Sequence, residues 1–96
     1  MTAQEFRATL SHPSPPSGLT PALTALWQDG RGDWDAAHRI AQDVAGRTGA
    51  WIHAYLHRKE GDLSNAAYWY RAAGRTMPES PHLDEWLSIV ETLLSA

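Results

Sequence analysis

A short phrase in which glycine is followed by aspartate occurs twice in this chain, and it constrains the fold more than any other feature. The two copies read Gly32-Asp33-Trp34-Asp35-Ala36-Ala37 and Gly61-Asp62-Leu63-Ser64-Asn65-Ala66-Ala67. In each copy the glycine breaks an incoming helix, the aspartate caps the outgoing helix, and an alanine lies five residues after the glycine. Such a small residue lets two antiparallel helices approach closely. The phrase therefore predicts two helical hairpins.

Caps, glycines and prolines predict the remaining boundaries. Gly46 or Gly49 is expected to end the helix that Asp33 caps, and the next helix to begin near Ala50. Thr2 and Glu5 form the pattern of a capping box, and this first helix is expected to end near Ser11. Thr20-Pro21 and Ser80-Pro81 each read as a cap followed by proline at the first helical position. No segment alternates apolar and polar residues as a strand would, so we expect an all-α fold of about six helices. The expected organisation is a single domain (1–96) with an N-terminal helix and proline-rich linker (1–18), a first hairpin (20–46), a second hairpin (50–76) and a C-terminal capping helix (80–96).

The second hairpin carries a more specific pattern. Counted from Gly61, alanine, aromatic and proline residues follow at Ala66, Trp69, Tyr70, Ala73 and Pro78. In this order they resemble the second half of a tetratricopeptide repeat, and the copy that begins at Gly32 is a degenerate match. The resemblance covers about residues 21–78 and implies stacked helix pairs that act in protein interaction. The sequence around this copy is also similar to short, mostly bacterial proteins. That similarity implies no particular activity.

Composition excludes several classes of function. The 96 residues include eight Lys and Arg against eleven Asp and Glu, a formal net charge of −3, which argues against a nucleic-acid partner. No cysteine is present, so a disulfide framework and a thiol nucleophile are excluded. The N-terminal sequence lacks the apolar run of a signal peptide, and no stretch is long enough for a membrane span. We therefore expect a cytoplasmic protein with no membrane partner.

Three histidines are the first group of candidate site residues. His53 and His57 are four residues apart on one helix, the spacing at which two imidazoles can bind one metal ion. His38 would join them if the two helices pack antiparallel. A metal site requires the ring nitrogens to lie within about 4 Å of a common point. The sequence lacks the glutamate of an HExxH motif, so it favours histidines that hydrogen-bond to neighbouring helices, and we expect no metal ion and no cofactor.

A polar and aromatic face on the second hairpin supplies the other candidates. Tyr68 and Arg71 lie within about 60° of each other on one helix, opposite the expected apolar stripe, and Arg58 precedes the turn. Arginine offers a planar fork for a carboxylate, and tyrosine offers a flat platform. The face is predicted to recognise an acidic or C-terminal peptide, although a solvated surface with weak ion pairs would have the same composition.

The sequence thus favours a non-enzymatic interaction module, because no GxSxG serine motif or phosphate-binding loop is present. Its partner would be a protein or peptide. One alternative is a small-ligand or metal-binding protein, including a hydrolase, that uses the three histidines. Another is a structural homodimer, because two helix pairs leave apolar faces open. The predicted groove is lined by His38, His53, His57, Arg58, Tyr68 and Arg71.

Overall fold

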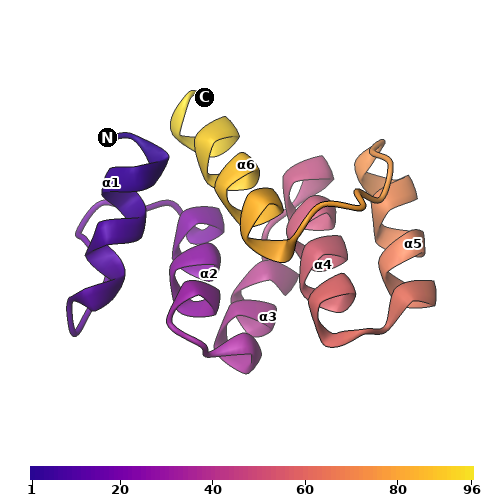
Figure 1. Ribbon diagram of the computed structural model, residues 1–96, viewed down its shortest axis with the longest axis horizontal. Helices are drawn as coiled ribbons and strands as arrows, with labels where there is room; N and C mark the ends of the chain where they lie inside the picture. Colours follow the sequence, from indigo (N-terminus) through magenta and orange to yellow (C-terminus); the bar gives the residue numbers. More distant parts are fainter.

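The computed structural model describes residues 1–96 and consists of helices joined by turns and coil (Figure 1). They are α1 (Ala3–Ala8), which continues into a short 3₁₀ helix (Thr9–Ser11), α2 (Pro21–Gly30), α3 (Trp34–Gln42), α4 (Gly46–Glu60), α5 (Leu63–Ala73) and α6 (His82–Leu94). No strand is present. The all-α fold of about six helices is confirmed. None of these helices combines the length and the apolar character needed to cross a membrane.

The two Gly–Asp phrases make equivalent turns. Gly32 has φ of 88° and Gly61 has φ of 90°, and these left-handed conformations are readily available to glycine. The aspartates that follow, Asp33 and Asp62, have ψ of 77° and 76°. Each aspartate side chain accepts a hydrogen bond from the backbone N–H three residues later, and thus caps the outgoing helix. The repeat inferred from the sequence is therefore present in the backbone geometry.

Helix packing follows from these turns. Helix α2 packs against α3, α4 packs against α5, and α3 joins the two hairpins by packing against α4. The expected close-contact alanines, Ala37 and Ala66, are fully buried. Helix α6 lies across both hairpins against α2 and α4, and α1 packs against α6, so that the two termini lie near each other (Figure 1). One core of 20 buried hydrophobic residues runs through the whole chain.

Two helix boundaries differ from the predicted ones. The second hairpin was expected to begin at residue 50, yet α4 begins at Gly46, and α3 already ends at Gln42. Gly49 does not break the helix. A Cβ atom at this position would lie 1.8 Å from the backbone oxygen of Val44, so glycine is needed for a close backbone approach.

The start of the last helix also differs. Helix α6 begins at His82 with Pro81 at its N-cap position, and no side chain caps it. The Ser80 hydroxyl therefore does not act as the predicted cap. Instead, the Ser80 backbone carbonyl accepts a hydrogen bond from the Arg58 guanidinium.

Arg58 belongs to a buried polar network. Its guanidinium donates to Glu85 of α6 at 2.9 Å, and the Tyr70 hydroxyl and Trp51 indole N–H also donate to this carboxylate. Arg58 was predicted to line an open groove with the histidines. It is only 9% exposed and lies in this buried network instead. Burial, together with the Glu85 carboxylate, raises the pKa of Tyr70 far above its ordinary value, so this hydroxyl stays a donor.

Candidate metal centre

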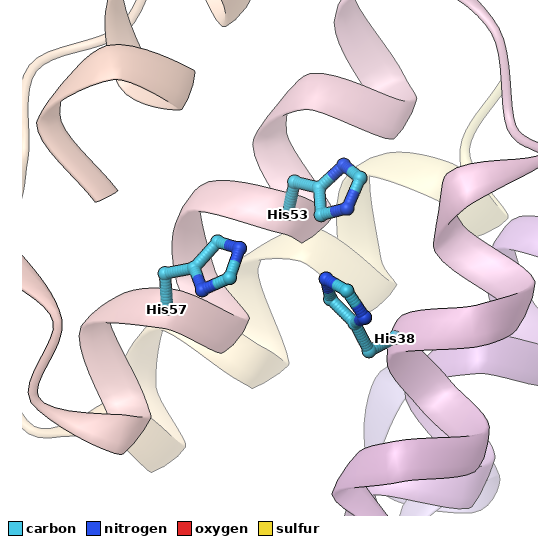
Figure 2. A group of neighbouring side chains, drawn as sticks. All are labelled: His38, His53 and His57. Carbon is cyan, nitrogen blue, oxygen red and sulfur yellow. The ribbon is translucent and has the colours of Figure 1, made fainter. Parts of the chain in front are cut away.

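His38 from α3 and His53 and His57 from α4 turn their rings toward one another at the junction of the two hairpins (Figure 2). We call these three residues the histidine triad. The ring centroids are 4.9 Å apart for His38 and His53, 5.2 Å for His38 and His57, and 5.7 Å for His53 and His57. The packing of α3 against α4 and the four-residue spacing on α4 together produce this cluster.

The ring nitrogens are close enough to share one ion. One nitrogen from each histidine can be chosen so that all three lie within 4.8 Å of one another. Such atoms have a common point no more than about 2.8 Å from each, against a zinc–nitrogen bond of about 2.0–2.1 Å. Inward movements of less than about 1 Å per side chain would therefore complete the coordination. The convergence that the metal hypothesis requires is present.

His57 is oriented by a carboxylate. Its Nδ1 lies 2.7 Å from Oε1 of Glu60, one turn further along α4. A proton on Nδ1 donated to this oxygen leaves the lone pair on Nε2, the arrangement found around metal-bound histidines. Nε2 has one weak neighbour, the side-chain amide of Asn65 at 3.4 Å. His57 thus has the support that a metal ligand usually receives.

His38 and His53 are held differently. Neither ring makes a hydrogen bond within the chain, so they are not the hydrogen-bonded histidines that the sequence favoured. His38 stacks on Trp34 with ring centroids 4.9 Å apart, and His53 stacks on Trp69 at 4.3 Å. No fully buried side-chain nitrogen or oxygen in the molecule lacks a partner, so the nitrogens of these two rings keep some access to solvent. Stacking thus holds these two rings while their nitrogens form no bond within the chain.

Burial keeps two of the three imidazoles neutral near pH 7. Desolvation lowers the pKa of His53 to about 4, and the neighbouring His38 and His57 add to the shift. The pKa of His38 is also lowered, first by desolvation and then by His57. Neutral imidazole is the form that binds metal ions.

A second group of ligand atoms adjoins the triad. His57, Glu60 and Asp62 also offer one ligand atom each within 4.8 Å of one another. Asp62 already caps α5, and Glu60 already accepts from His57, so this group is accounted for by helix capping and by the orientation of His57.

The other two predicted site residues, Tyr68 and Arg71, lie on the surface of α5. Tyr68 is 56% exposed and Arg71 is exposed on α5. Five surface hollows of about 290 to 490 Å³ have linings that include none of the triad residues, Tyr68 or Arg71. The structure therefore brings the three histidines together and leaves Arg58 in the buried network.

The predicted site did not include the tryptophans that hold the triad. Trp34 lies one helical turn before His38, a spacing that is visible in the sequence. Trp69 reaches His53 across the α4–α5 pair, and Asn65 reaches His57 in the same way. Those two contacts depend on the rotation of α5 against α4, for which the sequence contains no local signal.

A search of protein-family models, of curated proteins and of solved structures found no match for this chain. The resemblance to tetratricopeptide repeats therefore stays a prediction. Functional inference for this all-α, two-hairpin protein depends on its own residues.

Proposed function

We propose that this protein binds a transition-metal ion, with Zn²⁺ as the leading candidate, through His38, His53 and His57. The observation that carries the proposal is the convergence of three imidazole nitrogens from two hairpins. Imidazole suits zinc, copper and nickel better than it suits magnesium or calcium, which prefer oxygen ligands. The proposal replaces peptide recognition as the leading function, because three converging imidazole nitrogens are a more specific arrangement than two exposed side chains on α5.

The coordination would be completed from outside the triad. Three histidines fill three positions of a tetrahedral site, and a fourth position then remains for water or another ligand. His57 would bind through Nε2, with the Glu60 carboxylate on Nδ1 to fix its orientation and raise its basicity. The weak contact of Asn65 with Nε2 would be displaced.

A titration with Co²⁺ tests the proposal, because tetrahedral Co²⁺ sites absorb visible light and Co²⁺ substitutes for Zn²⁺. The untagged protein is expected to bind one equivalent, and Zn²⁺ should displace it. Replacing His38, His53 or His57 with alanine should each weaken the affinity for Zn²⁺ by about tenfold or more, an effect of the size seen when metal-site groups are removed.

The chain provides matched controls. His12 and His82 are exposed histidines outside the triad, and His12→Ala/His82→Ala should keep the affinity of the original protein. An equal loss of Zn²⁺ affinity in the control and triad variants would reject the metal site. The absence of visible absorption at one equivalent of Co²⁺ would also reject it.

A second candidate is the interaction module, with its recognition surface restricted to the outer face of α5. What favours it is the exposure of Tyr68 together with Arg71, whose guanidinium makes no ion pair within the chain. This pair would take an acidic peptide or a C-terminal carboxylate. The double variant Tyr68→Ala/Arg71→Gln should bind an immobilised library of acidic peptides more weakly than the original protein does. The control variant Arg47→Gln should bind the library as the original protein does. Equal binding by the two variants would exclude this surface.

A further inference from the structure

A surface hollow of about 380 Å³ lies where α1, α2, α4 and α6 meet. Its size falls within the range of small-molecule sites, and sites between the helices of a bundle are common. None of the histidine triad lines it. The buried residues of its lining are Asp29, Tyr55 and Trp86, and its exposed residues include Arg7, Lys59 and Leu83.

The polar groups on the buried side already have partners. The Asp29 carboxylate accepts from the Tyr55 hydroxyl at 2.7 Å and from the Lys59 ammonium at 3.0 Å. The Trp86 indole N–H donates to a backbone carbonyl of α2. This side of the hollow therefore offers a ligand no free hydrogen-bonding group and only a small part of its aromatic rings, since Tyr55 is 2% and Trp86 3% exposed, and the charge of Asp29 is compensated by Lys59.

The exposed side carries an uncompensated cation. Arg7 makes no ion pair within the chain, and its guanidinium makes no hydrogen bond there. The other charged groups of the lining, Lys59 and Asp29, neutralise each other, and His82 adds positive charge only when protonated. The hollow thus combines apolar walls, which include Leu10 and the 43% exposed Leu83, with one excess positive charge.

We infer that this hollow binds a small organic anion with a flat apolar body, such as an aromatic carboxylate. Its carboxylate would pair with the planar fork of Arg7, and its body would lie between Leu10, Leu83 and Trp86. This inference is independent of the metal site.

The test compares two probes of the same shape, 2-naphthoate and its uncharged analogue 2-naphthamide. Titrations followed by saturation-transfer NMR, in the presence of a chelator, should show tighter binding of the carboxylate. Arg7→Gln should weaken the binding of 2-naphthoate by about tenfold and leave the binding of 2-naphthamide nearly unchanged, since it removes the charge and the planar fork that the carboxylate would use. Leu83→Glu, which places a negative charge at the exposed wall of the hollow, should also weaken the binding of 2-naphthoate.

Arg47→Gln is the matched control, because it removes an exposed arginine that does not line this hollow. It should bind both probes as the original protein does. Three results would each overturn the inference: no binding of 2-naphthoate, equal affinity for the two probes, or the same loss in Arg47→Gln as in Arg7→Gln. Every variant changes an exposed residue, and thermal unfolding would verify that each is folded.

Discussion

Aromatic stacking leaves the ring nitrogens of a histidine free for other bonds, whereas a hydrogen bond occupies them. His38 and His53 stack on tryptophans, and His57 alone is held by hydrogen bonds. At the scale of single residues, this difference separates two histidines whose nitrogens are free from the one histidine that Glu60 orients.

Glu60→Gln should weaken Zn²⁺ binding about tenfold, because an amide is a poorer acceptor for Nδ1–H of His57 than a carboxylate. The free energy of unfolding of the metal-free protein should change by less than about 1 kcal/mol, since the hydrogen bond between His57 and Glu60 is partly exposed. Competition with a chromophoric chelator measures the affinity. Glu79→Gln, at an exposed glutamate away from the triad, is the control. Unchanged affinity in Glu60→Gln would show that Glu60 does not support the site.

The metal-free protein should lose stability as the pH falls from about 6.5 to about 4. His53 has a folded-state pKa of about 4, and the unfolded chain has the ordinary value of about 6.5. Between these values the unfolded chain binds a proton that the folded chain does not, so this histidine lowers the free energy of unfolding as the pH falls, by less than the roughly 3 kcal/mol of the full shift because solvent screens part of it. Below about pH 4 its contribution becomes constant.

Urea unfolding at a series of pH values measures this effect. The decline between pH 6.5 and 4 should be shallower in His53→Gln and unchanged in His12→Gln. An identical decline in the original protein and in His53→Gln would show that the pKa of His53 is not lowered.

At the scale of helices, the sequence correctly predicted the four helix starts that have a capping side chain. It did not correctly predict the boundary between the third and fourth helices. Thr2, Thr20, Asp33 and Asp62 all cap helices as expected, because each capping bond is local and spans three residues. Gly49 misled the prediction because the close approach of the Val44 carbonyl depends on how the chain enters α4. Glycine as a helix breaker and glycine as a contact position look alike in sequence.

Gly49→Ala should therefore destabilise the protein by about 3 kcal/mol, because the backbone at Val44 must move to admit a methyl group. Gly32→Ala is the comparison. It has open space around the added methyl group and costs about 1 kcal/mol through its left-handed backbone conformation alone. Denaturant unfolding measures both variants, and equal costs would contradict the close approach.

At the scale of the whole molecule, α6 ties the hairpins together through its buried polar residue as well as its apolar face. Glu85 accepts from side chains on α4 and α5, and the Trp86 indole N–H donates to α2. The sequence predicted the C-terminal capping helix, yet it placed Arg58 in a binding surface. The pairing of Arg58 with Glu85 depends on the docking of α6, which no local pattern specifies.

Self-association stays a prediction, which the mass from light scattering would test.

Arg58→Met should cost about 3 kcal/mol, because it leaves the buried Glu85 carboxylate without its cation. Adding Glu85→Gln should recover part of this loss, since the amide buries no charge. A double-mutant cycle from denaturant unfolding measures the coupling. Strictly additive losses would show that the two side chains do not interact in solution.

X-ray absorption at the zinc edge, on the protein loaded with one equivalent of Zn²⁺, tests the metal site most directly. A zinc ion bound by the triad should have three imidazole nitrogens at about 2.0 Å and one further light ligand, and the imidazole signal should be reduced in His53→Ala. A zinc shell made only of oxygen atoms, or one that is the same in His53→Ala, would contradict binding by the triad.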